Sequence, residues 1–340
     1  MGVQDYSGGT PMKSLNQDEN QKQEKAVEQE QSSQQETSSK EHAQPVNVED
    51  LFITIFFIVD NWFIANEEKH KMFGRKASFS NSEVATLVLM MDFLPYPSER
   101  QFLAFTRANY LYLFPDLLSQ GQFNVRVRLI RRHIDALRRH WTKKLVKEAQ
   151  QFLLLDTTPV PVLSYKRNKD SSDFLGSANY GYCSSKAMKY FGYKLVMLTS
   201  LTGVPLHLEL VPANTDERAA AEEVLQFVKG CEIIGDKGFI GEEWQAEMFG
   251  EGNRVWTSKK KNQKVQNPKE FDKLINRLRQ RIEGTFNELK NLGKDVEKLL
   301  AKTVVGLVAR VMATITSHIF KFYLRRFYNI DVQTFSTIPA

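Results

Sequence analysis

The order of apolar segments in the second half of the chain restricts its fold most strongly. Short segments rich in Leu, Val and Ile, with the length of β-strands, lie at residues 152–155, 194–200, 204–211, 231–234 and 254–257. Segments with the apolar periodicity of helices lie at residues 216–229, 242–249 and 269–292. Thr202 and Gly203 join the second and third strands in a predicted hairpin. This order predicts an α/β fold with a mixed five-stranded sheet.

The first half of the chain is predicted to be helical. An apolar segment at residues 50–66 is followed by helices at residues 83–91 and 99–110, each preceded by a serine that can cap it. Two short capped helices joined by a break are typical of a helix-turn-helix that reads DNA, and equally of a plain αα-hairpin. The pattern leaves both interpretations open.

A further helix is predicted at residues 125–150, and its charge is strongly unbalanced. It carries nine basic side chains against two acidic ones. Either this is a solvated helix face, or it is a surface that contacts phosphates; repulsion between like charges at helical spacing favours the second interpretation. The basic residues are Arg126, Arg128, Arg131, Arg132, Arg138, Arg139, Lys143, Lys144 and Lys147.

The charge of the chain differs between its N-terminal tail and the rest. Residues 1–45 have almost no large apolar side chain and cannot bury enough surface to fold, so we expect a disordered tail. Residues 1–50 hold 4 of the 46 Lys and Arg and 10 of the 40 Asp and Glu, which leaves 42 basic and 30 acidic residues in 51–340. The resulting +12 favours a polyanionic partner, either a nucleic acid or a membrane surface.

Membrane-spanning and disulfide-rich classes fit the sequence poorly. The apolar run at residues 51–65 is interrupted by Asp60 and Asn61, and it is shorter than the roughly 20 residues that span a bilayer. Cys183 and Cys231 are too few for a disulfide framework or a four-thiolate zinc site. We therefore expect a cytoplasmic protein that associates with the nucleoid and does not bind membranes.

Three acidic residues stand out by their positions. Asp156 ends the first predicted strand, Asp236 ends the fourth, and Glu283 lies in the middle of the last helix of this region. Ligands of open α/β sheets collect at the carboxyl ends of strands, so these side chains could converge. Three carboxylates at one place suit a hard cation such as Mg²⁺ or Mn²⁺.

The helix at residues 269–292 has two stripes. One stripe is apolar and would pack on the sheet. Beside it lie Asn276, Arg279, Glu283 and Lys290, where Glu283 could reach a metal ion and the two cations could touch phosphate. The alternative is an ordinary surface with Arg279 and Glu283 as an i,i+4 ion pair, and spacing alone leaves both interpretations open.

Three segments of the chain, LLLDTTPVPV, IIGDKGF and RQRIEGTFNELK, resemble the catalytic blocks of DDE transposases of bacterial insertion sequences. In that family the last block has Arg, three residues, Glu, six residues and Lys, which matches Arg279, Glu283 and Lys290; Asn276 stands where a Tyr is usual. The resemblance covers roughly residues 75–325 and includes FGYKL, GVP and VPAN. It implies a ribonuclease H-like catalytic core.

The resemblance also implies a reaction. Asp156, Asp236 and Glu283 would be the catalytic residues and would hold two Mg²⁺ or Mn²⁺ ions, one activating water or a DNA 3′-hydroxyl and the other stabilising the leaving oxygen. The family reaction is cleavage at the element ends followed by strand transfer into target DNA. The alternatives are a metal-dependent nuclease of the same fold without strand transfer, and a sequence-specific DNA-binding protein that has lost catalysis.

The expected partners are double-stranded DNA, as element ends and as target, and a second copy of the chain in a homodimer on DNA. The expected divisions are the disordered tail 1–45, a helical DNA-binding region 46–150, the core 151–293 and a C-terminal helical segment 294–340. Besides the basic helix, a lysine-rich loop before residue 269 and a lysine after the second acid are predicted to face DNA. The predicted DNA contacts are Arg279, Lys290, Lys237, Arg131, Arg132, Arg138, Arg139, Lys259, Lys260 and Lys261.

Overall fold

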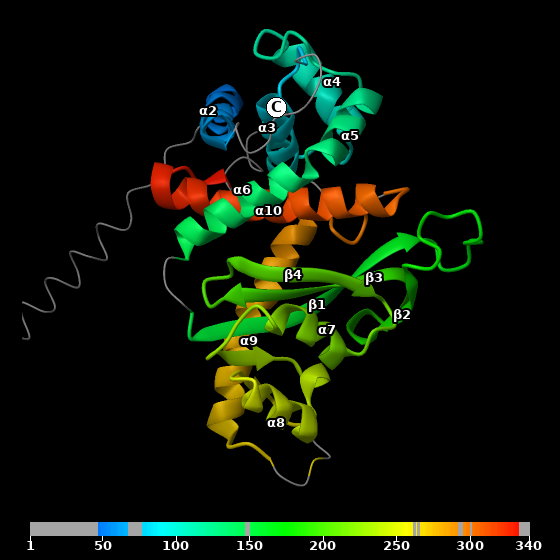
Figure 1. The fold of residues 1–340 in the computed structure, drawn as a ribbon, viewed down its shortest axis with the longest axis vertical. Helices are drawn as coiled ribbons and strands as arrows, with labels where there is room; N and C mark the ends of the chain where they lie inside the picture. The colour runs from blue at the N-terminus through cyan, green and yellow to red at the C-terminus, as the bar shows by residue number, and fades with distance from the viewer. Residues whose placement is uncertain are drawn as a thin grey trace, which may run out of the picture. The chain divides into compact units, whose positions relative to one another are not determined.

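The computed structural model describes residues 47–66, 77–146, 150–260, 263, 266–291, 295–299 and 301–332 (Figure 1). The predicted disordered tail at residues 1–45 and the predicted DNA contact Lys261 lie outside the described residues. In chain order the elements are α2 (Val48–Asn66), α3 (Asn81–Phe93), α4 (Glu99–Asn109), α5 (Gln120–Leu129), α6 (Arg131–Leu145), β1 (Phe152–Leu163), β2 (Asn179–Cys183), η2 (Ser184–Lys186), β3 (Met188–Ser200), β4 (Pro205–Pro212), α7 (Glu217–Leu225), β5 (Glu232–Gly235), η3 (Lys237–Phe239), α8 (Glu242–Gly250), β6 (Arg254–Thr257), α9 (Lys269–Asn291) and α10 (Val304–Tyr328).

The sheet is mixed and has six strands, one more than predicted. β1 is antiparallel to β3 and parallel to β5, β5 is parallel to β6, and β3 is antiparallel to β4. The order β4-β3-β1-β5-β6 is that of a ribonuclease H-like core, so the predicted fold class is confirmed. The sixth strand, β2, pairs with the first half of β3, on the same edge that β4 occupies further along.

Two features of the strands could not be read from the apolar pattern. β2 has the sequence NYGYC, with no buried side chain to mark it as a strand. β1 continues to Leu163 although Pro159 and Pro161 lack the N–H that a strand normally donates. The N–H of Thr157 bonds to the Asp156 carboxylate, away from β3, and both prolines have the orientation of Thr157 in the strand. They therefore face an edge that β5 no longer covers, where no donor is required.

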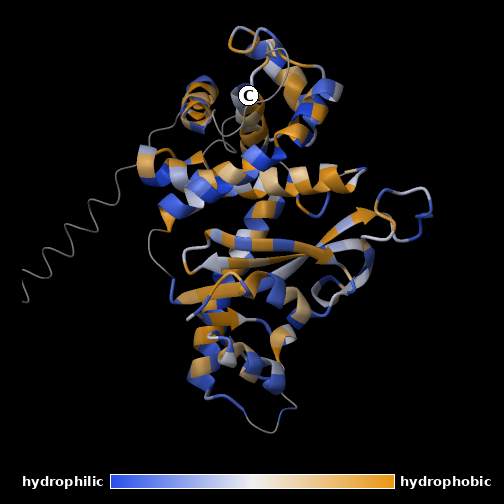
Figure 2. Cartoon of the chain, in the orientation of Figure 1, coloured by the Kyte–Doolittle hydropathy of each residue, from blue (hydrophilic) through white to orange (hydrophobic). Residues whose placement is uncertain are grey.

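Alternating side chains of the central strands divide the core into two faces. Leu153 and Leu155 of β1 join a cluster with α7 and α8, while Leu154 faces α9 and the N-terminal helices. Figure 2 shows the hydrophobic residues in orange along the strands and along α10. The apolar stripe of α9, including Ile282 and Phe286, is buried on the second face, as predicted. This packing holds the polar stripe of α9 beside the strand ends.

The long C-terminal helix α10 is a core helix. It packs against α6, α3, α5 and α9, and Trp141 of α6 stacks on Phe320 at 4.2 Å between ring centroids. Among the described helices α10 alone is long and apolar enough to cross a membrane, but two thirds of its most apolar window is buried inside the protein. It carries one continuous hydrophobic core from the helical region to the sheet.

The N-terminal helices differ from the prediction in two respects. The single helix predicted at residues 125–150 is two helices, α5 and α6, separated at Ile130. α3 packs mainly on α2 and α10, and α4 on α5, so the packing of α3 and α4 resembles a helical bundle more than an isolated hairpin. The serines expected to cap α3 and α4 are Ser80 and Ser98, and Asp216 caps α7.

Candidate active site

The strand register brings Asp156 and Asp236 to the same edge of the sheet. Leu155 of β1 and Gly235 of β5 form the last pair of these two parallel strands, and each acid is the next residue along the chain. Asp236 follows the end of β5, whereas Asp156 lies within β1, which was predicted to end there but continues to Leu163. The two strands run in the same direction, so the residues that follow their last pair lie side by side. Asp236 directly precedes the single turn η3.

Arg279 connects the second and third acids. Its Nη1 lies 3.1 Å from Asp236 Oδ1 and its Nη2 lies 3.2 Å from Glu283 Oε1. The arginine side chain is 14% exposed, whereas those of Asp236 and Glu283 are 47% and 50% exposed. The i,i+4 ion pair considered above therefore exists, but the same guanidinium also holds the carboxylate at the end of β5. Arg279 Nε is buried with no hydrogen-bond partner among the described residues.

Asp156 is half-buried and lies within reach of the charges of the other two acids. Burial raises its pKa from 3.8 to about 7; the Thr157 N–H and Arg279 oppose this shift, and Asp236 and Glu283 add to it. The three carboxylates are thus close enough for their charges to interact. At neutral pH a substantial fraction of Asp156 is protonated, and a nearby cation would favour its ionised form.

The donor set fits a divalent cation, although the described residues contain no ready-made metal cluster. No group of three His, Cys, Asp or Glu within the described ranges lies close enough to hold an ion. The Arg279 guanidinium is the positive charge between Asp236 and Glu283. Three carboxylates with a raised pKa at one of them are the hard, repelling oxygens that Mg²⁺ or Mn²⁺ satisfies.

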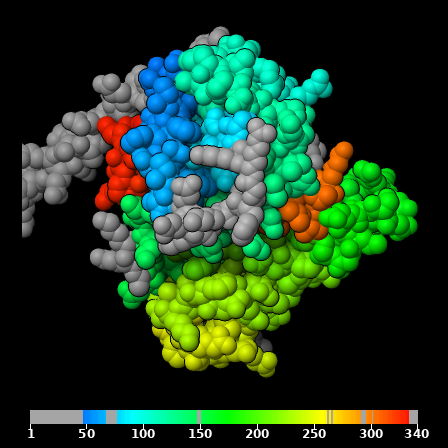
Figure 3. All heavy atoms as spheres, turned by 45° about the horizontal axis from the view of Figure 1, so that its top comes forward, coloured from blue at the N-terminus to red at the C-terminus, as the bar shows by residue number. Residues whose placement is uncertain are grey.

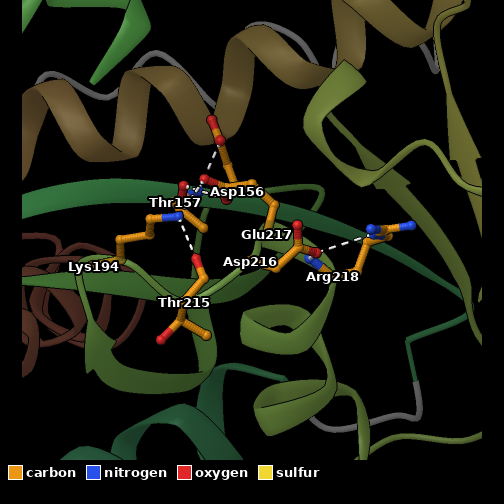
Figure 4. A network of polar contacts seen from close by, with 7 residues as sticks. All are labelled: Asp156, Thr157, Lys194, Thr215, Asp216, Glu217 and Arg218. Carbon is orange, nitrogen blue, oxygen red and sulfur yellow. Dashed lines mark hydrogen bonds and ion pairs between the residues drawn. The ribbon is translucent and has the colours of Figure 1, made fainter. Parts of the chain in front are cut away.

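A polar network that the sequence did not indicate supports Asp156 (Figure 4). The Thr157 hydroxyl donates to Glu217 Oε2 at 3.0 Å, and the Lys194 ammonium donates to Glu217 Oε1 at 2.8 Å and to the Thr215 carbonyl at 2.7 Å. Glu217 also touches the loop after Asp236, since a Cβ on Gly238 would lie 3.2 Å from its Cγ. Glu217 therefore contacts the segments that carry two of the acids.

A second carboxylate that the sequence did not indicate, Glu297, holds the predicted phosphate contact Lys290. Lys290 Nζ lies 2.9 Å from Glu297, which also bonds to Lys186 and accepts from the Thr158 hydroxyl at 3.2 Å. Burial works to raise the pKa of Glu297, but hydrogen bonds from Lys186 and Lys290 offset this and leave the pKa below its ordinary value. Lys290 is thus tied to the strand of Asp156, and its side chain is 24% exposed.

The remaining predicted DNA contacts fall into two groups. The prediction that Arg138 contacts DNA is wrong, because this side chain is buried. It donates to Asp135 at 2.8 Å and to the Leu206 carbonyl at 3.2 Å, since its position on α6 faces the β3–β4 hairpin. Arg131 is half-buried and donates to the Arg128 carbonyl at 2.9 Å. The exposed or partly exposed positions are Arg132, Arg139, Lys237, Lys259 and Lys260.

Comparisons with known proteins agree with this geometry. Residues 146–299 match the family model described as "Transposase DDE domain", a span that contains all three acids. The cryo-EM structure of the piggyBac transposase synaptic complex with hairpin DNA is similar at a TM-score of 0.46 and 13% identity, covering 83% of this chain and 76% of that one. The Mos1 transposase paired-end complex with left transposon end is matched at a TM-score of 0.18 and 11% identity, covering 74% and 90%.

No curated protein matches the chain at a significant level. The family match, the strand order and the grouping of the acids where the pairing of β1 with β5 ends point the same way. Over residues 146–299 this chain is similar to a transposase DDE domain.

Proposed function

We propose that this chain is a transposase that cuts DNA at the ends of a mobile element and joins the freed ends to target DNA. The observation that carries the proposal is the parallel register Leu155–Gly235, which brings Asp156 and Asp236 together while Arg279 draws in Glu283. A DDE domain of this kind implies dependence on divalent metal ions in general. This grouping supports Asp156, Asp236 and Glu283 as the residues on which that dependence would rest.

Asp156, Asp236 and Glu283 would hold the metal, which we propose to be two Mg²⁺ or Mn²⁺ ions. When bound, the ions supply an activated attacking oxygen and stabilise the leaving oxygen of the phosphodiester. The chain itself has to release the proton of Asp156 and to position this carboxylate through Thr157 and Glu217. Arg279 offsets the negative charges of Asp236 and Glu283. No protein side chain acts as the nucleophile in this proposal.

Arg279 has two roles in the proposed site. It neutralises Asp236 and Glu283 in the structure described above, and its Nε–H has no partner among the described residues. With these carboxylates neutralised by bound cations, the Arg279 guanidinium would be free to bind a phosphate oxygen, for which its planar fork is well suited. Lys237, exposed directly after Asp236, lies beside the same place.

We also propose that the chain acts as a homodimer on DNA. Concerted joining requires two element ends and therefore two sets of the three acids, each supplied by one chain. The net positive charge outside the tail supports binding of the ends through phosphates.

Cleavage of the DNA that flanks the gene tests the proposal. With Mg²⁺, the full chain should cut at inverted repeats and yield products joined to a target plasmid. D156N, D236N and E283Q should each lose cleavage while still binding DNA, and E243Q, which changes an exposed acid on α8, should behave as wild type. Cutting without joined products would instead identify a nuclease, and binding without cutting in the wild type would identify a protein that has lost catalysis.

A further inference from the structure

β1 continues well beyond the active site and carries a projecting segment, here called the arm (residues 164–187), which leads through β2 back to β3. In Figure 1 the arm extends past the sheet, and in Figure 3 its bright green atoms protrude beside the orange segment before α10. From Asp156 to the end of β1 the strand runs for seven residues, about 23 Å at the rise of a β-strand. The arm is therefore near the acids but outside their site.

The arm is held rigidly by a buried cation. Lys169 is 7% exposed, and its ammonium donates to the carbonyls of Ser164 at 3.1 Å, Tyr165 at 2.6 Å and Arg167. It also lies 5.4 Å from the ring centroid of Tyr180 and 5.3 Å from that of Phe191. Asp173 anchors the other side of the arm by accepting from the Val304 N–H at 2.7 Å, at the start of α10. The arm thus has a fixed shape before any partner binds.

Aromatic rings are exposed on this rigid support. Tyr165, Tyr180 and Tyr182 are 43%, 48% and 59% exposed. Tyr180 makes edge-to-face contacts with Tyr165 at 5.3 Å and with Phe191 at 5.1 Å between ring centroids. Tyr180 and Tyr182 are two residues apart on β2 and lie on the same face of the sheet. Large aromatic rings that are half-exposed forgo part of the favourable free energy of burial. A group of such rings on the surface therefore indicates a binding site.

Basic side chains surround these rings. Lys166 and Arg167 are exposed next to Tyr165, and Lys189 is paired across from Tyr182 on β3. Residues 164–191 contain five Lys and Arg against two Asp. Lys169 is buried and Lys186 is paired with Glu297, which leaves Lys166, Arg167 and Lys189 as the exposed cations of this surface. A partner that offers both flat faces and negative charge fits this surface. Unpaired nucleotides do so, whereas the bases of an intact duplex stack on each other and hide their faces.

We propose that the arm binds unpaired DNA bases several nucleotides away from the bond that is cut, with Tyr165 and Tyr180 stacking on bases and Lys166 and Arg167 contacting the adjoining phosphates. This inference rests on the proposed function, because cleavage is what would produce frayed or single-stranded ends at this distance from Asp156. Stacking on pre-ordered rings costs little ordering entropy, so two tyrosines suffice for a measurable preference.

Binding to two DNA probes tests the arm. One probe is a blunt duplex, and the other is the same duplex with a tail of about eight thymidines. The full wild-type chain should bind the tailed probe more tightly. The double variant Y165A/Y180A should lose at least about tenfold in affinity for the tailed probe and none for the blunt probe. The matched variant Y165F/Y180F, which keeps both rings, should bind like wild type.

A second variant keeps the test independent of the folding of the first. K166A/R167A changes only exposed side chains and should flatten the salt dependence on the tailed probe by roughly 0.7 in log–log slope per lost contact. Equal loss on both probes, or no loss for either variant on the tailed probe, would overturn the arm proposal. These results leave the proposed function standing if wild type still cuts element ends, whereas wild-type protein that binds neither probe overturns both.

Discussion

Burial, together with the negative charges of Asp236 and Glu283, favours the protonated form of the Asp156 carboxyl. Its pKa of about 7, raised from 3.8, means that the folded chain holds a proton which the unfolded chain has already released between pH 4 and pH 7. Stability from this group is therefore full below pH 4, falls as the pH rises towards 7 and stays low above it. The raised pKa of Asp156 therefore lowers the free energy of unfolding at neutral pH, and it leaves a carboxyl whose ionised form a bound cation would favour.

The variant D156N tests whether the raised pKa of Asp156 makes the stability of the protein depend on pH. In metal-free buffer its stability relative to wild type should increase by roughly 2 kcal/mol between pH 5 and pH 8, because the amide cannot ionise. Urea unfolding at both pH values measures the difference, with E243Q as a control for the removal of an exposed charge. A stability difference that does not change with pH would mean that Asp156 is not shielded as the structure indicates.

Glu217 is the second residue whose role can be isolated. E217Q keeps an acceptor for Thr157 but leaves Lys194, whose side chain is 13% exposed, without its counter-charge. We expect roughly tenfold slower cleavage, since small displacements of Asp156 are costly. T157S should retain activity and T157V should lose it, because only the hydroxyl reaches Glu217. Wild-type rates for both E217Q and T157V would remove this network from the mechanism, and E223Q on the same helix provides the control.

The two parts of the site were not equally predictable. Asp156 and Asp236 could be found because each follows an apolar strand, and local sequence determines both strand and position. Glu217 and Glu297 could not, because their partners in β1 lie 60 and 139 residues away in the chain. Such contacts depend on tertiary packing, which no local pattern records.

At the scale of elements, the basic segment predicted as one helix at residues 125–150 belongs to two helices, α5 and α6. The sequence predicted one helix, but Ile130 ends α5 and begins α6. α6 then turns Arg138 towards β4 and leaves Arg132 and Arg139 outside, the latter 67% exposed. Apolar periodicity predicted the helical content, whereas the break and the buried arginine depend on contacts with α10 and the hairpin.

Substitutions on the exposed side and on the buried side of α6 should have different effects. R132A/R139A should flatten the slope of log affinity against log salt by up to roughly 0.9 per lost phosphate contact on duplex DNA. R138A should leave the slope unchanged and lower the free energy of unfolding by about 1–3 kcal/mol, since it removes the hydrogen bond to the Leu206 carbonyl and leaves Asp135 with Arg139 as its ion-pair partner. Salt titrations and urea unfolding separate the two effects. An unchanged slope in R132A/R139A would make this side of α6 an ordinary solvated face.

At the scale of the whole molecule, the helices and the sheet share one hydrophobic core through α10. The proposed DNA contacts on α6 and the three acids therefore belong to one packed body. The strand order of the sheet was predictable only as a fold class. We expect the proposed second chain and DNA to bind at exposed faces of this body.

The assembly on DNA is the prediction at this scale. Because one chain supplies one set of three acids, joining two ends requires two chains. Light scattering of the full chain with element-end DNA should give the mass of a dimer, and E243Q should assemble equally. A single protein chain that joins both ends would show that the dimer is unnecessary.

The most direct measurement is Mn²⁺ binding by the full chain, followed by electron paramagnetic resonance of the free ion. The account predicts that wild-type protein with DNA binds Mn²⁺ at the three acids, that affinity rises as the pH passes through about 7 as Asp156 loses its proton, and that a triple variant D156N/D236N/E283Q loses this binding. E243Q should bind as wild type does. Unchanged Mn²⁺ binding in the triple variant would contradict the assignment of Asp156, Asp236 and Glu283 as the metal site.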